Sequence, residues 1–298
     1  MKLRTVASVL DIPANAWNAC ANPSGHNPCV THEFFRAVEE SGSAVARTGW
    51  RGQHLVCENQ HGEIEGVAPC YLKSHSQGEY VFDHGWAQAF QRAGGSYYPK
   101  LQASVPFTPV TGPRLLATRA GTRKLLAQGL VALCEQTGAS SVHITFLPEK
   151  DWTAAEQPSW LRRQDIQFHW NNRNYVNFED FLASLSSSKR KNIRKERQAV
   201  RDAGLTFEWV TGCDLREHHC HAFFEFCMDT GSRKWGSPYL TRTFFSLISE
   251  TMPRSILLIL AKRGGRTIAG ALNFIGADAL YGRNWGATEN HQYLHFEA

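Results

Sequence analysis

The stretch from residue 186 to 205, SSSKRKNIRKERQAVRDAGL, places six lysines and arginines between Lys189 and Arg197. Its serines provide an N-cap and its glycine a stop, which predicts a helix from about 188 to 203. On that helix Arg190, Arg194, Arg197 and Arg201 fall on one side, beside a narrow apolar edge. Guanidinium groups donate paired hydrogen bonds to phosphate, and the capped N-terminus adds free N–H groups. The stretch predicts a site for a phosphate-bearing ligand; the alternative is a solvated basic face.

Two short motifs combine residue types that transfer protons and bind substrates. DHGW, at 83–86, and NWGATE, at 284–289, each end an expected strand in one half of the chain. Carboxylates, imidazoles and indoles are typical of the lip of a substrate cleft. The candidate proton carriers are Asp83, His84, Glu289 and His295. The candidate substrate contacts are Trp86, Tyr281, Arg283 and Trp285. The alternative for DHGW is a turn at a strand end, with Trp86 in the core.

Two loops rich in glycine and proline add further candidates. In GSRKWGSPYL, at 231–240, Lys234 suits a phosphate or carboxylate, and Trp235 and Tyr239 suit stacking on a sugar or base. The alternative is a loop whose hydrophobic side chains fill a gap in the core. FTPVTGPR, at 107–114, has a single glycine and no Walker spacing, so Arg114 is a minor candidate for the phosphates of a donor.

The cysteines and histidines indicate core packing rather than chemistry. Eight cysteines are scattered without a CxxC pair, which favours buried thiols in a reducing cytoplasm over a disulfide framework. In CDLREHHCHAFFEFC, the residues Cys220, Phe223, Phe224 and Cys227 share one helical face, whereas the neighbouring histidines point in different directions. We therefore predict no metal site and nominate no cysteine nucleophile.

Composition and charge set broad limits on the protein. The 298 residues are 42% hydrophobic and 20% charged, as in ordinary globular proteins. The net charge of +5 mildly favours anionic partners. The longest apolar run, at 255–261, is far shorter than the ~20 residues needed to cross a bilayer, and we expect a cytoplasmic protein without a membrane span.

An internal repeat indicates the architecture. THEFFRAVEE, at 31–40, matches TRTFFSLISE, at 241–250, and a second match aligns Ile64 with Ile268 and Gly66 with Gly270. Each copy predicts an amphipathic helix, a strand, a glycine-containing turn and a second strand. We expect two duplicated α/β domains, at 1–164 and 165–298. The second lacks counterparts of the last loop, helix and strand of the first and is predicted to be incomplete at its C-terminal end.

The order of these elements, with the basic helix opening the second unit, resembles the FemABX group of the GNAT acyltransferase superfamily. The blocks GEYVFDHGWAQAF, GGSYYPKLQASVPFTPVTGPRLL, FHWNNRNY, RKWGSPYLTRTFF and IAGALNFIGADALYGRNWGA more closely resemble the FemAB-like family, described as peptidoglycan biosynthesis or recognition. The resemblance implies tandem GNAT-like domains of mixed, mostly antiparallel sheets flanked by helices. It also implies that members of the family continue for several tens of residues beyond the last residue of this chain.

The resemblance implies transfer of an acyl or aminoacyl group to an amine, with a cell-wall precursor as the candidate acceptor. Acyl-CoA or aminoacyl-tRNA is the implied co-substrate, with no permanently bound cofactor, and tRNA is a candidate partner. Donor phosphates are expected at Arg190, Arg194 and Arg197, with Arg114 as the minor candidate. Two alternatives stay open. One is a non-catalytic module that recognises a cell-wall precursor or RNA, and the other is a GNAT acetyltransferase acting on a small amine or a protein.

Overall fold

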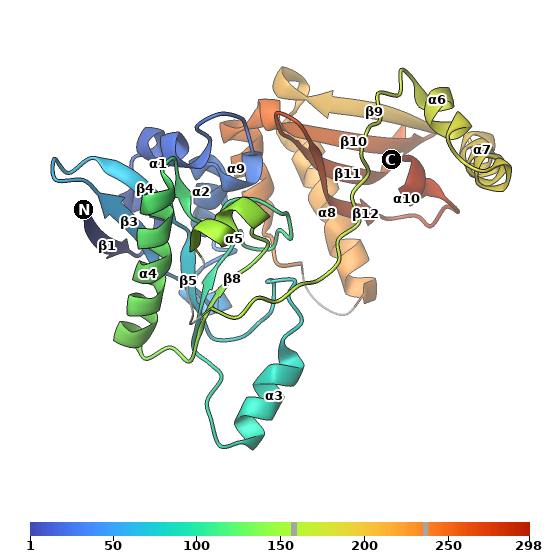
Figure 1. Ribbon diagram of the computed structural model, residues 1–298. Helices are drawn as coiled ribbons and strands as arrows, with labels where there is room; N and C mark the ends of the chain where they lie inside the picture. The colour runs from blue at the N-terminus through green and yellow to red at the C-terminus, as the bar shows by residue number, and fades with distance from the viewer. Residues whose placement is uncertain (156–159, 235–237) are drawn as a thin grey trace.

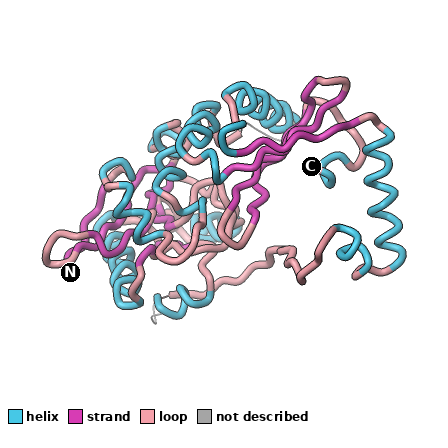
Figure 2. Tube along the Cα trace, turned by 90° about the horizontal axis from the view of Figure 1, so that it is seen from above, coloured by secondary structure: helices cyan, strands magenta, loops and turns pink. Residues whose placement is uncertain are grey.

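A computed structural model describes residues 1–155, 160–234 and 238–298. Figure 1 shows two groups of elements side by side, one from each half of the chain. Residues 160–177 contain no helix or strand and carry the chain from the first half to the second, as Figures 1 and 2 show. Within the described ranges, no helix is long and apolar enough to cross a membrane.

The first half contains two four-stranded sheets, ordered β1-β3-β4-β7 and β2-β5-β6-β8. Their strands pair antiparallel except β6 and β8, which are parallel. The strands are β1 (Lys2–Val6), β2 (Trp50–Gly52), β3 (His54–Glu58), β4 (Ile64–Ala68), β5 (Cys70–Lys73), β6 (Lys100–Ala103), β7 (Leu116–Ala117) and β8 (Val142–Ile144). The α-helices are α1 (Ala14–Ala21), α2 (His32–Glu40), α3 (His84–Arg92), α4 (Ala120–Thr137) and α5 (Glu149–Ala155).

The second half contains one antiparallel sheet of order β12-β11-β10-β9. Its strands are β9 (Leu205–Thr211), β10 (Ile256–Arg263), β11 (Arg266–Ile275) and β12 (Leu280–Ala287). The helices are α6 (Phe178–Ala183), α7 (Ser187–Asp202), α8 (Glu217–Lys234), α9 (Arg242–Thr251) and the short α10 (Leu294–Glu297). The molecule is thus a mixed α/β fold of mainly antiparallel sheets.

The predicted repeat is present at the level of a helix and a hairpin. Both α2 and α9 begin after a threonine whose side chain accepts a backbone hydrogen bond, Thr31 from Phe34 and Thr241 from Phe244. The hairpins β3–β4 and β10–β11 follow these helices. The rest differs, because the strands of the first half form two sheets and those of the second form one.

Two local predictions are wrong. The segment EYVFDHGWA is not a strand, because it forms a loop followed by α3. Tyr80 has a left-handed φ of 58°, which a strand cannot contain. Residues 231–234 are not a loop either, since α8 continues through Lys234.

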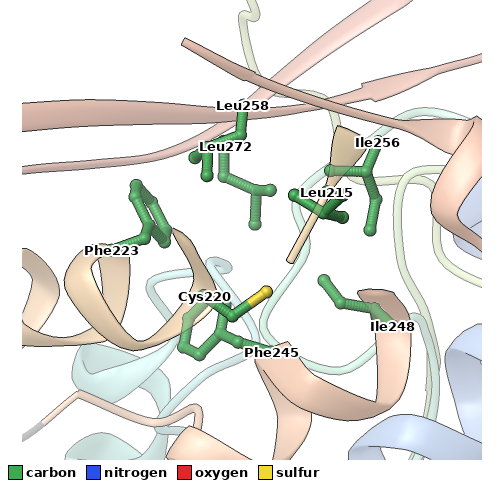
Figure 3. A pocket seen from close by; sticks show the side chains of 8 residues that line it. All are labelled: Leu215, Cys220, Phe223, Phe245, Ile248, Ile256, Leu258 and Leu272. Atoms are coloured by element: carbon green, nitrogen blue, oxygen red, sulfur yellow. The ribbon is translucent and has the colours of Figure 1, made fainter. Parts of the chain in front are cut away.

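One apolar core extends across both halves. The Phe34 ring of α2 lies 5.8 Å from Phe244 of α9 and 5.6 Å from Phe274 of β11. The predicted core positions Cys220, Phe223 and Cys227 of α8 are buried in the same cluster. Figure 3 shows a small apolar cavity beside Cys220 and Phe223, between α8, α9 and the second sheet. Its volume of about 10 Å³ leaves no room for a substrate.

Candidate functional site at the junction of the two halves

Arg283 of β12 reaches from the second half to the first. Its Nε donates to Thr108 Oγ1 at 3.2 Å, and its Nη2 donates to the Tyr80 hydroxyl at 3.4 Å. The guanidinium lies 5.3 Å from the centre of the Tyr80 ring. Burial lowers the pKa of Arg283, and no carboxylate in the described ranges forms an ion pair with it. This half-buried cation can bind a carboxylate or phosphate group of a ligand.

Aromatic rings from both halves surround this contact. Tyr239 stacks on Phe107 with ring centres 5.3 Å apart and an interplanar angle of 13°. Burial and the nearby Tyr80 phenol raise the pKa of Tyr239. Tyr80 and Phe107 have φ values of 58° and 57°, a conformation that few non-glycine residues adopt and that often occurs at functional sites. Since 39% of Tyr80 and 44% of Tyr239 remain exposed, a ligand can reach both phenols.

Four buried charged residues lie behind this junction. Lys100 Nζ is 2.8 Å from Glu79 and also pairs with Asp83, which accepts a hydrogen bond of 2.8 Å from the Tyr97 hydroxyl. Lys73 Nζ lies 4.0 Å from Glu79. Burial lowers the pKa of Lys73 to about 7, although the Glu79 charge opposes this shift. Burial would raise the pKa of Asp83, but its hydrogen bonds, led by that from Lys100, lower it to about 2.

Trp50 connects this buried network to the junction. Lys73 Nζ lies 3.5 Å from the centre of the Trp50 ring, and that ring lies 5.1 Å from the ring of Phe107. Gly78, with φ of 79°, fits beside Phe107 only because it has no side chain: a Cβ there would come within 2.6 Å of the ring. The loop that carries Tyr80 is therefore held between the network and the aromatic stack.

The structure does not place Asp83 at the lip of an open substrate cleft. The residue is only 2% exposed and neutralises Lys100, and a carboxylate with so low a pKa is a weak base. His84 is exposed in the first turn of α3. Trp86 is 60% exposed, so it is not the core residue of the alternative interpretation.

The two other predicted proton carriers lie near the end of the chain. Glu289 pairs with His291 at 2.9 Å, with Arg263 at 3.0 Å and with Arg266. The hydrogen bond from His291, followed by the arginine charges, lowers the pKa of Glu289. The ring of the exposed His295 lies 3.8 Å from that of Phe296, tilted by 39°. In the described part of the chain, no hydrogen bond or ion pair joins any two of the four predicted proton carriers.

The basic helix forms as predicted, as α7 (Ser187–Asp202), with Ser186 as its N-cap. Arg190 has no ion pair in the described ranges, and the exposed Arg194 pairs with the exposed Glu179. Arg197 pairs with Glu297 at 2.8 Å. A groove of about 460 Å³ lies beside this helix. It is lined by Phe178, Phe181, Ile193, Glu196, Arg197, Val200, Tyr293, Phe296 and Glu297.

The remaining predicted contacts fall into three groups. Arg114 is fully buried, and its guanidinium donates to the carbonyls of Gly112, Pro113 and Val110, so it is not the accessible loop arginine that the sequence predicts. Tyr281 and Trp285 are half-buried against apolar clusters. Lys234 is the last residue of α8, and Trp235 lies outside the described residues.

Comparisons with known proteins identify a family. No curated protein matches the sequence. The solved structure of L-PGS from Bacillus licheniformis is 9% identical, with a TM-score of 0.43 over 89% of this chain and 67% of that one. A conserved protein of unknown function from Bacteroides thetaiotaomicron VPI-5482 is also 9% identical, with a TM-score of 0.46 over 91% of this chain and 75% of that one. The family model described as peptidoglycan biosynthesis/recognition matches residues 8–298, and the chain therefore belongs to the FemAB-like family.

Proposed function

We propose that this protein is a GNAT-type N-acyltransferase of the FemAB-like family, with a peptidoglycan precursor as its amine acceptor. The proposal rests mainly on Arg283. This cation has no acidic partner in the described ranges and donates hydrogen bonds to two hydroxyls of the other half. A peptidoglycan precursor carries carboxylates and phosphates that this guanidinium is suited to bind. Family membership supplies the link to peptidoglycan.

In the proposed reaction a neutral amine attacks the carbonyl carbon of the donor. A C–N bond forms, and the C–S bond of a thioester or the C–O bond of an aminoacyl ester breaks. The proton lost by the amine passes through water to the departing thiolate or alkoxide. Tyr80 accepts a hydrogen bond from Arg283, so its own hydroxyl hydrogen is available to the carbonyl oxygen as negative charge develops there.

In this proposal α7 binds the phosphates of the donor, either acyl-CoA or aminoacyl-tRNA. Arg190 is free of carboxylates in the described ranges, and the partner of Arg194 is an exposed glutamate that a phosphate can displace at little cost. Lys191 and Lys195 are also exposed on this helix. A tRNA would contact more phosphates than coenzyme A, so its affinity should fall more steeply with salt.

The test is titration calorimetry with acetyl-CoA and with aminoacyl-tRNA, each at two salt concentrations. The variant Arg190→Glu/Arg194→Glu should bind the donor at least about tenfold more weakly, because two phosphate contacts become repulsions. The matched control is Arg119→Glu/Lys124→Glu, which makes the same charge change on exposed residues around the start of α4. Equal affinities for all three proteins would overturn the assignment of α7.

The description of the family also supports a second candidate, a recognition module without catalysis. It would bind a peptidoglycan precursor through Arg283 and yield no acylated product. Arg283→Met should weaken binding of a soluble precursor in both cases. A mass spectrum of the precursor after incubation with each donor separates the two candidates, because only the transferase adds the mass of an acyl group.

A further inference from the structure

Helix α3 displays a row of large aromatic side chains to solvent. It extends away from the body of the first half (Figure 1). Phe82 is 75% exposed, Trp86 is 60% exposed and Phe90 is 47% exposed. Trp86 and Phe90 lie one helical turn apart on α3, and Phe82 comes just before the N-cap residue Asp83. Three large exposed aromatics in such an arrangement mark an interaction surface, because burying them in another phase is favourable.

The helix holds this surface in a fixed orientation. Asp83 anchors its start through Lys100 and Tyr97, and Ala87 is buried on the side of the helix that adjoins the aromatic row. Phe90 packs against Gly95, where a Cβ would come within 2.4 Å of its ring. The aromatic side chains therefore project from an element that is fastened to the buried ion network.

The charged side chains around the aromatic row are mainly basic. Residues 84–98 contain no acidic residue, and the Asp83 carboxylate points inward to Lys100. Arg163 Nη2 donates to the carbonyl of Phe82 at 3.3 Å, and its guanidinium lies 5.8 Å from the Trp86 ring centre. Arg92, at the end of α3, and Arg162 are also exposed, and Asp165 is the nearest acidic residue along the connector. Aromatic side chains flanked by arginines are complementary to a lipid surface that carries phosphate.

We propose that α3 docks on the surface of a bilayer containing anionic lipids. Phe82, Trp86 and Phe90 would enter the boundary between headgroups and acyl chains, where aromatic rings are favoured. Arg92, Arg162 and Arg163 would contact lipid phosphates, each adding electrostatic attraction. The helix lies along the interface and spans nothing. This inference is independent of the acyl-transfer proposal, since it involves a different surface and a different ligand.

Co-sedimentation with vesicles tests the proposal. The probe is a vesicle made of equal parts phosphatidylcholine and phosphatidylglycerol, with pure phosphatidylcholine for comparison. Wild-type protein should bind the anionic vesicles, and Phe82→Ser/Trp86→Ser/Phe90→Ser should reduce the partition coefficient at least about tenfold, because the buried aromatic area is lost. Trp209→Ser, at a tryptophan of β9 that is 72% exposed, is the matched control and should bind like the wild type.

A charge variant separates the electrostatic part of the binding. Arg92→Glu/Arg163→Glu should bind anionic vesicles much more weakly and should lose the preference over phosphatidylcholine. Circular dichroism checks that each variant is folded. Equal binding by the wild type and a folded triple variant would overturn the proposal, and so would absence of wild-type binding to anionic vesicles. A dimer that only the triple variant disrupts, seen by sedimentation velocity, would instead assign the face to a second copy and also overturn it.

Discussion

Lys73 is fully buried, and its ammonium lies beside the Trp50 ring with Glu79 as its nearest carboxylate. Its pKa of about 7 in the folded protein lies far below the value of about 10.4 expected for the unfolded chain. The unfolded chain therefore binds more protons between these two values. The resulting stability is present above the unfolded pKa and is lost as the pH falls toward about 7.

This difference predicts how Lys73→Met changes the pH dependence of stability. From about pH 7 to about pH 9, the free energy of unfolding of the wild type should rise relative to that of the variant, by up to about 1.4 kcal/mol per pH unit. Urea denaturation at several pH values measures both curves, and contributions from the buried cysteines cancel in the comparison. Parallel curves would show that the lysine titrates normally in the folded protein.

The buried network also predicts a large effect for Lys100→Met. The substitution leaves Glu79 and Asp83 buried without their close cation, and breaking a buried ion pair costs about 3–5 kcal/mol. Arg4→Met is the control, because it breaks the more exposed 2.7 Å pair with Glu58 and should cost no more than about 1 kcal/mol. Equal losses of unfolding free energy in the two variants, measured by denaturant titration, would contradict the structural role of the network.

Residue types alone identified part of the candidate site. Tyr239 and Arg283 were selected from their sequence motifs, and the structure places both at the junction. Lys73 and Lys100 were not selected, because their burial depends on partners far apart in the sequence. Asp83 was selected for its carboxylate, but its pairing with Lys100 could not be read from its neighbours.

At the scale of elements, helices with local signals were the most predictable. The basic run and its capping serine fixed α7 to within a residue at each end, and the matched sequences located α2 and α9. The segment EYVFDHGWA is predicted as a strand because it begins with strand-forming residues, but it forms a loop that leads into α3. The conformation of that loop depends on contacts of Gly78 with Phe107 and of Asp83 with Lys100, which sequence periodicity does not reveal.

The repeated helix caps predict paired effects on stability. Thr31→Ala and Thr241→Ala should each lower the free energy of unfolding by about 1 kcal/mol, since each removes an N-cap acceptor. The two losses should be similar, because each hydroxyl also donates to a carbonyl: Thr31 to Pro28 at 2.8 Å, and Thr241 to Ser41 in the first half at 3.2 Å. Thr118→Ala, at an exposed position that caps no helix, should change little. No loss for Thr241→Ala beside a clear loss for Thr31→Ala would argue against the Thr241 cap and its contact with the first half.

At the scale of the whole molecule, the two halves are joined by the core between α2 and α9. The repeat predicted two similar units but did not predict that the first half would divide its strands between two sheets. That division depends on which distant strands pair, for example β4 with β7 and β6 with β8. Such non-local pairing has no local sequence signal.

A double-mutant cycle on Phe34 and Phe244 measures this connection. The single substitutions to alanine should each cost about 3–5 kcal/mol, and their contact across the halves should give a coupling energy of about 0.5–1.5 kcal/mol. Phe34 and Leu126 belong to separate apolar clusters and provide an additive control pair. Additivity of the Phe34 and Phe244 variants would contradict a core shared by the two halves.

The central claim is acyl transfer at the junction, and its most direct test is mass spectrometry of a product. The protein is incubated with a soluble peptidoglycan precursor that carries a free amine, and with acetyl-CoA or aminoacyl-tRNA. We predict a precursor whose mass has increased by one acyl or aminoacyl group with one of the donors, and at least about tenfold less of it with Arg283→Met. If donor and precursor both bind the folded wild-type protein but no product forms, the result contradicts acyl transfer and favours the recognition module.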